Sequence, residues 1–519
     1  MLPVDLDSLS LDAVRRGALA GVPVTVLGLA RTGVGLARFL ADAGAAVTVY
    51  DGKPEAALAD RLAELDGRPV RLLAGPDVDP ASTWAGAALV AFSPSITPGF
   101  PTTEPRLRAA LDDLTARLRG GDMAAPVLVS ESDLTLRLCP APTIGVTGTK
   151  GKTTTASLIA YLLSADPAHP VVLGGNIGVP LIDRVMELTP AHRVVVELSE
   201  LQLPSLTRGT TVAVYTNVTA DHLDRHGSLA AYRAVKRRLA ELVDPAGALV
   251  LNLDDPVVGG YAGLGTAPAV CYRLEHPIPG GVGVVDGWVV AADVERLPVV
   301  GRGHAWTGPD GRIMPIAESS LPGRHNVSNL LAAVTVGLIF GLAPDAIRAA
   351  ASTFEGVEHR LEPVGLVDGV RFVNDSQGTQ PDAVAAALRS FDAPLVLIAG
   401  GRDKGVDLRA LAPVVAERAA AAVLIGESGP TLAALFRAAG CRRVEEAGTL
   451  ETAVPRADAI ARELLAGAVP GSVATVLLSP AAASFDQFPD YAARGRAFKV
   501  AVAGLAAAAR TSAGSHRGG

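Results

Sequence analysis

The sequence has little of several features that would place it in a specialised class of protein. Its three cysteines, Cys139, Cys271 and Cys441, are too few and too far apart for a disulfide framework or a zinc site. No apolar run reaches the roughly 18 residues needed to span a bilayer. The acidic start of the chain lacks the basic and apolar regions of a signal peptide. We therefore expect a soluble, cytoplasmic protein with no membrane insertion.

Positive charge is not in excess either. The chain has 46 basic and 53 acidic side chains, a net charge of −7, so it offers no basic surface for nucleic acid. Its 519 residues are too many for one hydrophobic core, and two to four domains are expected. Aromatic residues make up only 4% of the chain, while Leu, Val and Ala dominate. This composition favours an α/β fold, with helices packed on aliphatic strands.

Lysine is the scarcest charged residue. Only six of the 46 basic residues are lysine, and Lys236 stands beside Arg237 and Arg238 on a helix expected to begin near Ser228. Arginine would serve equally well as a surface cation, but it cannot become neutral. A neutral lysine amine can react with CO₂ to form a carbamate, which resembles a carboxylate metal ligand. The plainer alternative is a solvated cation on a helix face.

The order of apolar segments predicts three α/β domains. They cover residues 1–140, 141–350 and 351–510, followed by a flexible tail at 511–519. The first opens with a strand, a Gly turn, a helix and a second strand that ends at Asp51, the βαβ layout of a Rossmann-like nucleotide-binding domain. Residues 268–320 are rich in Gly and short β runs, which predicts a small antiparallel accessory sheet. A helix is expected from about residue 326 to 340.

The segment VTGTKGKTTT, residues 146–155, follows an apolar strand and opens a helix. Gly148 and Gly151 allow the backbone to wrap around an anion, Lys152 would reach the β- and γ-phosphates of a nucleotide, and Thr153 would contact Mg²⁺. The strict phosphate-loop pattern is not met, because Val146 stands where its first Gly belongs. We therefore predict a central mononucleotide-binding domain with a P-loop and a mainly parallel sheet.

Two further segments place metal-ligand side chains at strand ends. Glu197 follows three valines, where a carboxylate is costly unless it is paired or bound to a metal. His222 comes just after another predicted strand. The carboxyl ends of parallel strands meet at one sheet edge, so both side chains are expected beside the phosphate loop. Taken alone, each also fits a structural role, as the partner of an Arg or as a loop residue.

The later segments carry weaker signals. Asn326 and Asn329 lie three residues apart, so they share one helix face and could bracket a purine or a ribose, although either could also cap the helix. In the third domain, three loops at predicted strand ends could jointly bind a small anionic molecule. Their polar and aromatic residues are Asp375, Ser376, Thr379, Lys404, Ser479, Ser484 and Phe485.

Taken together, these motifs and their order resemble the Mur ligase family over nearly the whole chain. The shared stretches are TGTKGKTT, GNIG, VELS, NVTADHLDRHG, YRAVK, LPGRHNVSN, EHR, NDSQGT, GGRDKG and SPAAASFDQF. Within the family, the last stretch and the NDS-x-x-T pattern look most like the member that adds D-glutamate to UDP-N-acetylmuramoyl-L-alanine. The resemblance implies a three-domain, ATP-dependent amide ligase of peptidoglycan synthesis that works through an acyl phosphate. Its C-terminal domain would also be Rossmann-like, and a monomer is expected.

The resemblance also implies roles for individual residues. The catalytic groups would be Lys152, Glu197, His222 and Lys236. One or two Mg²⁺ ions would be held by Thr153, Glu197, His222 and a carbamylated Lys236. ATP would contact Gly148, Thr149, Lys150, Gly151, Lys152, Thr153, Thr154, Asn326, Asn329, Arg360 and Asp375. The UDP-sugar would contact Arg31, Thr32, Gly33, Asp51, Ser93, Ser95, Asn176 and Ser199. D-glutamate would contact Thr379, Lys404, Ser479, Phe485 and Phe488.

The sequence departs from the family pattern in the amino-acid and uridine regions. Gln377 stands where Lys is common, Gln380 where Asn is common, and Gly52 and Lys53 replace the usual Thr–Arg pair. The sequence also allows two alternative functions. One is a related ligase, either folylpolyglutamate synthase-like or adding a diamino acid, but the Arg-rich selectivity stretch of a diaminopimelate ligase is missing. The other is a non-catalytic nucleotide-binding protein, which would not need a modifiable lysine.

Overall fold

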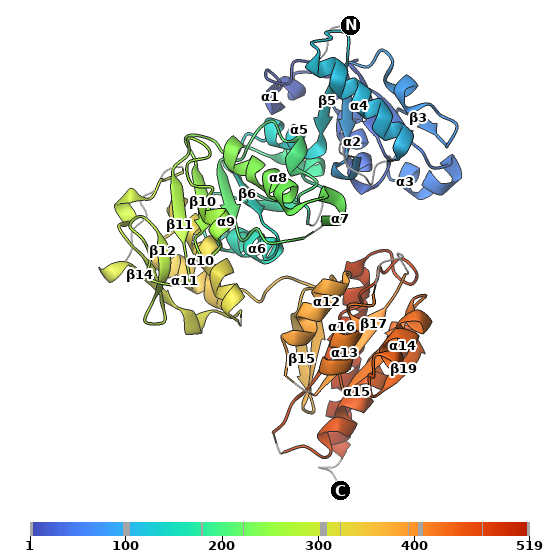
Figure 1. Cartoon of the computed structure of the whole chain (residues 1–519), viewed down its shortest axis with the longest axis vertical. Helices are drawn as coiled ribbons and strands as arrows, with labels where there is room; N and C mark the ends of the chain where they lie inside the picture. Colours follow the sequence, from blue (N-terminus) through green and yellow to red (C-terminus); the bar gives the residue numbers. More distant parts are fainter. Residues whose placement is uncertain are drawn as a thin grey trace. The chain divides into compact units, whose positions relative to one another are not determined.

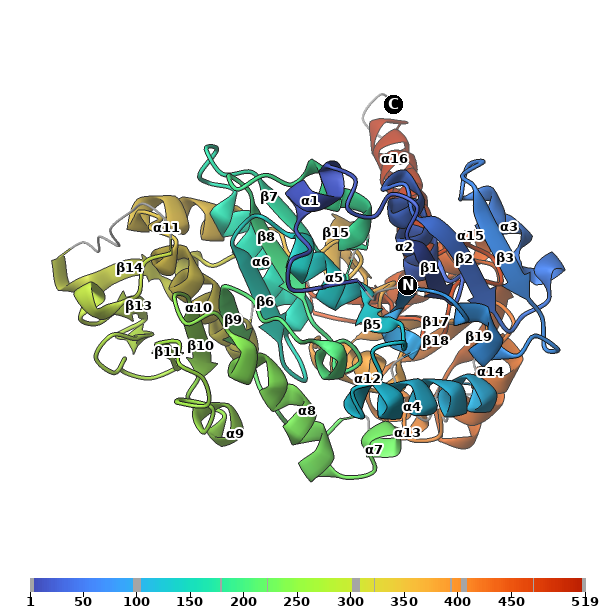
Figure 2. The same ribbon diagram turned by 90° about the horizontal axis from the view of Figure 1, so that it is seen from above.

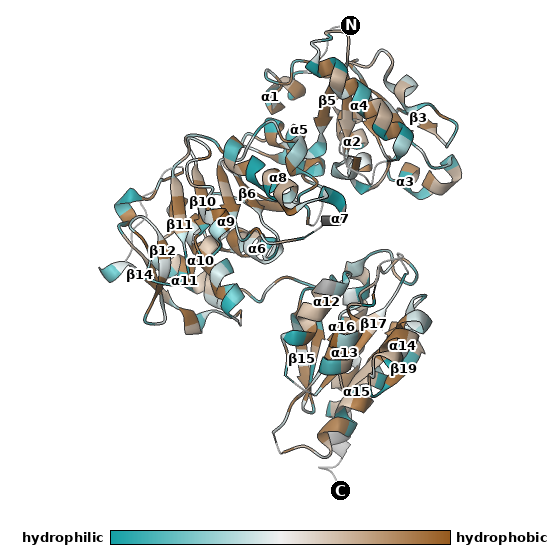
Figure 3. Cartoon of the chain, in the orientation of Figure 1, coloured by the Kyte–Doolittle hydropathy of each residue, from teal (hydrophilic) through white to brown (hydrophobic). Residues whose placement is uncertain are grey.

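The computed structural model describes residues 4–96, 104–177, 180–221, 223–300, 309–321, 323–392, 394–402, 408–469 and 471–515. The chain divides into two compact units, Met1–Phe354 and Glu355–Gly519 (Figure 1). The strands of the described residues form three sheets, two in the first unit and one in the second. Brown, hydrophobic colour is concentrated on these strands (Figure 3). The predicted α/β fold with mainly parallel sheets is confirmed.

The first sheet is entirely parallel, with the strand order β3-β2-β1-β4-β5. Its strands are β1 (Pro23–Leu27), β2 (Ala46–Asp51), β3 (Val70–Ala74), β4 (Leu89–Phe92) and β5 (Val127–Ser130). The helices around it are α1 (Leu11–Arg15), α2 (Arg31–Asp42), α3 (Ala59–Ala63), α4 (Pro105–Arg119) and α5 (Glu131–Leu138). Because β1, α2 and β2 follow in sequence, the predicted βαβ unit is present.

The second sheet has the order β14-β13-β12-β11-β10-β9-β6-β8-β7. Figure 2 labels the strands at its two edges, β14 and β7. Its strands are β6 (Thr143–Thr147), β7 (Val171–Gly175), β8 (Arg193–Glu197), β9 (Val212–Tyr215), β10 (Ala248–Asn252), β11 (Ala269–Tyr272), β12 (Val282–Val285), β13 (Trp288–Ala291) and β14 (Arg312–Pro315). The central strands β6, β8, β9 and β10 are buried at every residue, as expected for a parallel sheet covered on both faces.

The helices that follow these strands are α6 (Lys152–Leu163), α7 (Leu223–His226), α8 (Leu229–Leu242), α9 (Pro256–Gly259), α10 (Arg324–Ile339) and α11 (Pro344–Thr353). The predicted helix at 326–340 is therefore α10, which begins two residues earlier and packs against α6. A short 3₁₀ helix, η4 (Leu181–Glu187), packs against both α2 and α5. It also packs against strand β7 of the second sheet, so it connects the first two sheets.

The prediction of a separate accessory sheet over residues 268–320 is wrong. Strands β12, β13 and β14 are antiparallel to one another, but β11 pairs in parallel with β10, and Tyr272 of β11 pairs with Val282 of β12. These strands therefore extend the central sheet. The apolar strand β11 is largely buried and pairs with a neighbour on each side, β10 and β12. It therefore joins the parallel strands and the antiparallel strands into one sheet.

The second unit contains one sheet with the order β15-β16-β20-β17-β18-β19. Its strands are β15 (Glu362–Val367), β16 (Val370–Asn374), β17 (Leu395–Gly400), β18 (Ala421–Ile425), β19 (Val444–Gly448) and β20 (Ala474–Leu478). Its helices are α12 (Pro381–Arg389), α13 (Ala412–Arg418), α14 (Gly429–Ala438), α15 (Leu450–Leu465) and α16 (Tyr491–Ser515). All strand pairs are parallel except the hairpin β15–β16.

The two strands at the edges of this sheet were not predicted from the sequence. Strand β19 carries Glu445 and Glu446, and β15 contains Pro363, so neither shows the apolar run of a central strand. The last helix, α16, continues to Ser515, five residues into the segment expected to be a tail. Within the described residues, no helix is both long and apolar enough to cross a membrane.

Candidate active site

The phosphate loop lies between strand β6 and helix α6, and two glycines give it its shape. Gly148 has φ +149° and Gly151 has φ +82°. A Cβ atom on Gly148 would lie 2.0 Å from Thr216 Oγ1, and one on Gly151 would lie 2.7 Å from Asn329 Oδ1. Larger residues at either position would therefore be strained and would push away the neighbouring segments.

The segment after β9 holds the phosphate loop in place. Asn217 accepts hydrogen bonds from the backbone N–H of Thr149 through its carbonyl (2.8 Å) and from that of Lys150 through its side chain (2.9 Å). Thr216 Oγ1 donates to the carbonyl of Lys150 at 2.7 Å. The N–H groups in the first turn of α6 have no partner inside the helix, so they are the groups suited to bind an anion.

Three predicted nucleotide contacts lie in that first turn. Lys152 folds back over the loop, and its Nζ donates to the carbonyl of Thr149 at 2.9 Å. Thr153 is buried one residue later, while Thr154 is partly exposed. The predicted order of strand, Gly-rich turn, lysine and helix is present as the sequence indicated.

Lys236 reaches the same loop from helix α8. The helix begins after the cap Ser228, as predicted, and the Lys236 side chain is completely buried. Its Nζ donates to Gly148 O at 3.0 Å and to Thr147 Oγ1 at 3.3 Å. Burial, together with the positive charge of Lys152, lowers the pKa of Lys236 to about 7. This lysine is therefore not a solvated surface cation.

Glu197 ends strand β8, which is the neighbour of β6 in the sheet. Its side chain is only 1% exposed. Oε1 accepts a hydrogen bond from Asn176 Nδ2 at 2.8 Å, whereas the buried Oε2 has no hydrogen-bond partner among the described residues. A buried carboxylate oxygen without a partner is costly, and a divalent cation beside it would satisfy it.

The remaining predicted metal ligand cannot be placed. His222 lies outside the described residues, and within the described part of the chain no group of three His, Cys, Asp or Glu side chains could hold a metal. Thr153 lies in the first turn of α6 and Glu197 at the end of β8, and their role as metal ligands remains a prediction.

The two asparagines predicted near a nucleotide are tied to the phosphate-loop helix. Asn329 Oδ1 accepts from Thr155 Oγ1 at 3.1 Å, and Asn329 Nδ2 donates to Asn326 Oδ1 at 3.1 Å. Helix α10 has Gly323 as its N-cap and no side-chain cap. The capping explanation is therefore wrong for both, and the pair lies beside α6.

The predicted UDP-sugar contacts of the first sheet gather at its carboxyl edge. The Asp51 carboxylate accepts from the N–H groups of Leu29 and Lys53, both at 2.9 Å, and the Oγ atoms of Ser93 and Ser95 lie 2.7 Å apart. Gly33 allows α2 to approach the β1 turn, because a Cβ there would lie 1.8 Å from Gly28 O. Arg31 and Thr32 lie at the start of α2. Asn176 and Ser199 instead follow β7 and β8 of the second sheet.

The second unit carries its own set of predicted contacts. Asp375 directly follows β16 and is buried, and its two oxygens accept from Ser479 Oγ at 2.6 Å and from the N–H of Leu361 at 3.2 Å. Burial raises the pKa of Asp375 to about 6, although Ser479 and Arg360 oppose the change. The loops after β16 and β20 are thus in direct contact.

The other D-glutamate candidates differ in their surroundings. Thr379 follows Asp375 in the same loop, Phe485 is 62% exposed, and Phe488 packs against the apolar core around α15 and α16. Lys404 lies outside the described residues. The structure thus brings Asp375 and Ser479 together, places Thr379 in the same loop as Asp375, and leaves the Phe485 side chain exposed.

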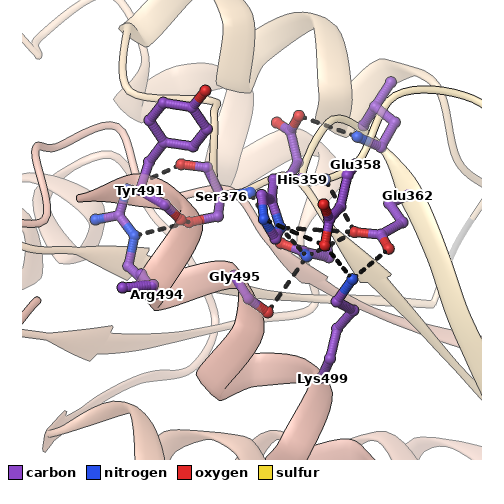
Figure 4. A network of polar contacts seen from close by, with 12 residues as sticks. Glu358, His359, Glu362, Ser376, Tyr491, Arg494, Gly495 and Lys499 are labelled. Atoms are coloured by element: carbon purple, nitrogen blue, oxygen red, sulfur yellow. Dashed lines mark hydrogen bonds and ion pairs between the residues drawn. The ribbon is translucent and has the colours of Figure 1, made fainter. Parts of the chain in front are cut away.

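Sequence reasoning missed a buried arginine that ties these loops together. Arg494, on α16, is 1% exposed and donates to Ser376 O, Ser376 Oγ and the carbonyls of Ala482 and Ala483 at 2.9–3.2 Å. Figure 4 shows Arg494 beside Ser376 and Tyr491, whose carbonyl accepts from Ser376 Oγ. The one signal in the sequence was the spacing: Arg494 lies four residues before Phe498, so it falls on the apolar face of the helix.

The same figure shows a second network around His359. This residue has φ +65°, is buried, and its Nδ1 lies 2.9 Å from Asn374 Nδ2 (Figure 4). Lys499 closes the network through Glu358 and Glu362, at 2.6 and 2.9 Å. The network fixes the backbone next to Arg360, the predicted nucleotide contact of this unit.

A phosphate loop, a buried lysine and a buried carboxylate at one edge of a parallel sheet define a nucleotide-binding enzyme domain. Comparison with known families agrees. The Mur ligase middle domain matches residues 146–337, and the Mur ligase glutamate ligase domain matches residues 359–482. The chain belongs to the Mur ligase family.

Similar proteins of known name share one description, UDP-N-acetylmuramoylalanine–D-glutamate ligase. The relative from Symbiobacterium thermophilum is 38% identical over 94% of this chain and all of its own length. That from Anaeromyxobacter dehalogenans is 39% identical over 93% of this chain and 97% of its own. Among solved structures, MurF from Acinetobacter baumannii matches 96% of this chain and 98% of its own with a TM-score of 0.53 at 15% identity, which supports the fold.

Proposed function

We propose that this chain is an ATP-dependent ligase that joins D-glutamate to UDP-N-acetylmuramoyl-L-alanine during peptidoglycan precursor synthesis in the cytoplasm. The observation that carries the proposal is the meeting of three groups at one sheet edge: the phosphate loop, the buried carboxylate of Glu197 and the buried amine of Lys236. The shared description of the relatives supplies the substrates. It also favours this ligase over the folate and diamino-acid alternatives.

We propose that the three predicted domains, residues 1–140, 141–350 and 351–510, each bind a different substrate or part of one. We expect a monomer. The first domain would bind the UDP part of the sugar nucleotide at the carboxyl edge of its sheet, around Asp51 and Ser93. The central domain would bind ATP along the phosphate loop, with Asn326 and Asn329 facing the adenine. The C-terminal domain would bind D-glutamate and, through Arg360 and Asp375, part of the nucleotide.

The residues present fit a magnesium ion. Glu197 Oε2, which has no hydrogen-bond partner among the described residues, and the hydroxyl of Thr153 are oxygen ligands of the kind that Mg²⁺ prefers. His222 and the carbamate of Lys236 would complete the set. When bound, Mg²⁺ supplies positive charge to the phosphoryl oxygens as negative charge develops on them.

Lys236 is suited to carbamate formation. Because the pKa of Lys236 is about 7, its amine is neutral in a large share of the molecules at neutral pH. The amine nitrogen bonds to the carbon of CO₂ and loses one proton, which gives an anionic carbamate. An anion at this position would balance the nearby charge of Lys152, whose repulsion contributes to the low pKa.

The reaction itself requires two displacement steps. A carboxylate oxygen of the L-alanyl group bonds to the γ-phosphorus of ATP, and the bond from that phosphorus to the β–γ bridging oxygen breaks, releasing ADP. The amine of D-glutamate then bonds to the acyl carbon, phosphate leaves, and the amine loses a proton. Lys152 and the first turn of α6 hold the phosphates in line and stabilise the charge that builds on them.

The test is phosphate release from the full-length protein with ATP, Mg²⁺, UDP-N-acetylmuramoyl-L-alanine and a panel of amino acids. D-Glutamate should support turnover, and a Lys152→Met variant should not turn over. Turnover with L-glutamate but not D-glutamate would overturn the assignment of the amino acid. Turnover with no amino acid in the panel would overturn the proposed ligase activity.

A further inference from the structure

A buried glutamine, Gln202, stands behind one of the predicted sugar-nucleotide contacts. It lies three residues beyond Ser199, in the loop after β8, and is 3% exposed. Its Oε1 accepts two hydrogen bonds from Ser199, one from the backbone N–H and one from Oγ, both at 2.9 Å. Its Nε2 donates to Ser132 Oγ at 3.0 Å. The amide of Gln202 is therefore held at both ends.

Ser132 connects this amide to a buried acid on helix α5. Ser132 Oγ donates to Glu131 Oε2 at 3.1 Å, and Glu131 Oε1 accepts from Thr135 Oγ1 at 3.3 Å and from the N–H of Ile182 at 3.4 Å. Burial raises the pKa of Glu131. These contacts fix Ser132 against the rest of the first unit, so the nitrogen end of the Gln202 amide has a rigid partner.

The chain of contacts continues to the first sheet. Asp183, next to Ile182 in η4, accepts from Arg38 Nη2 at 2.8 Å. Arg38 is on α2, the helix that follows the β1 turn where the uridine nucleotide is predicted to bind. Polar contacts therefore run from the helix behind the predicted uridine site to the loop that carries Ser199.

The other side of that loop is attached to the phosphate-loop strand. Thr147 Oγ1 donates to the carbonyl of Leu198 at 2.8 Å. Ser199 thus stands between two anchors, Thr147 at the end of β6 and Gln202 in its own loop. Because both lone pairs of Gln202 Oε1 accept from Ser199, the Ser199 hydroxyl proton points toward the amide. The oxygen of Ser199 then presents only its lone pairs to a ligand.

We propose that Gln202 is a positioning residue for the sugar nucleotide: it orients Ser199 as a hydrogen-bond acceptor for an N–H or O–H donor on the N-acetylmuramoyl-L-alanine part. This rests on the proposed function, in which Ser199 contacts that substrate. Gln202 acts only through Ser199 and does not touch the reacting atoms.

The test uses steady-state kinetics of the full-length enzyme with three variants: Ser199→Ala, Gln202→Met and the double variant. Gln202→Met should raise the KM for UDP-N-acetylmuramoyl-L-alanine by ~10-fold, a typical effect of losing one positioned hydrogen bond. The KM values for ATP and D-glutamate should change less than ~2-fold. In the Ser199→Ala background, Gln202→Met should add no further increase, because the two changes remove one interaction.

A matched control separates positioning from loss of stability. Thr335→Val removes a hydroxyl that is also fully buried and hydrogen bonded, to Leu331 O at 2.7 Å within α10. This variant should leave the KM for the sugar nucleotide unchanged. If Gln202→Met fails to fold, Ser132→Ala takes its place, since it frees only the far end of the amide, and it should raise the same KM several-fold.

Two results would overturn the inference. One is an unchanged KM for the sugar nucleotide in folded Gln202→Met. If Ser132→Ala is tested in its place, an unchanged KM in that variant has the same meaning. The other is a double variant whose KM increase is the product of the two single increases. Failure of the proposed function gives a different result: the wild-type protein would show neither turnover nor calorimetric binding of UDP-N-acetylmuramoyl-L-alanine. The inference would then be overturned as well.

Discussion

The ammonium nitrogen of Lys236 lies 3.0 Å from the carbonyl oxygen of Gly148, so a fully buried lysine on α8 touches the backbone of the phosphate loop. An arginine there would carry a permanent charge into the same buried space and could not form a carbamate. We expect Lys236→Arg to lower the rate of phosphate release by ~100-fold or more, the scale of losing a positioned charged group.

The same lysine gives a rescue experiment. Lys236→Ala should be inactive, and added formate or acetate should restore part of its activity by replacing the missing carbamate. Arg237→Ala is the control, because Arg237 is the next residue of α8 but its side chain is exposed and pairs with Glu241, so its loss should leave activity unchanged. Full activity of Lys236→Arg would rule out the carbamate.

Burial of Lys236 also predicts how stability depends on pH. Its pKa is about 7 in the folded protein against 10.5 for an unperturbed lysine. Between these values the unfolded chain holds a proton that the folded chain lacks, so the free energy of unfolding should rise with pH, by at most about 1.4 kcal/mol per pH unit. Below pH 7 both states are protonated and this contribution is flat.

This dependence can be measured by urea unfolding in CO₂-free buffer from pH 7 to 9.5. Lys236→Met should show a smaller rise over that window than the wild type, because only the wild type carries the lysine. Identical slopes for the two proteins would mean that Lys236 keeps an ordinary pKa in the folded state.

Glu197 allows a test of the metal site that does not depend on activity. Mg²⁺ should raise the Tm of the wild-type protein, because a ligand that binds only the folded state stabilises it. Glu197→Gln should lose most of that increase, since an amide cannot replace the buried carboxylate oxygen, Oε2, that no described residue contacts by a hydrogen bond. Without metal, the variant should be at least as stable as the wild type. An equal Mg²⁺ effect in both proteins would remove Glu197 from the metal site.

Arg494 should matter for the stability of the second unit. Arg494→Met would remove the guanidinium donors from the carbonyls of Ser376, Ala482 and Ala483, of which only Ala483 O would still accept a hydrogen bond within the described residues, from the N–H of Arg402. We expect the change to cost roughly 3 kcal/mol in the free energy of unfolding. Arg456→Met is the control, because Arg456 pairs with Glu445 at the surface, where such pairs contribute less than about 1 kcal/mol. Equal losses in urea unfolding would contradict a special role for the buried arginine.

Local patterns predicted the parts of the site that are contiguous in sequence. The phosphate loop, the cap Ser228 before α8 and the position of Glu197 at the end of β8 all follow from an apolar strand and the polar residues after it. Arg494 and Gln202 could not be found in this way. Arg494 is buried against Ser376, 118 residues away, and Gln202 against Ser132, 70 residues away. An arginine on a helix and a glutamine in a loop are both common, so neither stands out in the sequence.

The edges of the sheets show the same limit. Central strands such as β17 are uninterrupted apolar runs, so they stand out in the sequence. Strands β15 and β19 each have a neighbour on one side only, tolerate Pro or Glu, and resemble loops until their partners are known. For β11, the partner decides whether it belongs to a separate sheet or to the central one.

The hydrogen bonds from Thr149 and Lys150 to Asn217 have a consequence for how a nucleotide arrives. The turn is held in shape by these contacts within the protein, so capture of a triphosphate need not wait for the backbone to fold around it. Little conformational entropy is then lost on association. Replacing Asn217 by alanine should therefore slow nucleotide capture more than it speeds release, which stopped-flow fluorescence with a labelled ATP analogue can resolve.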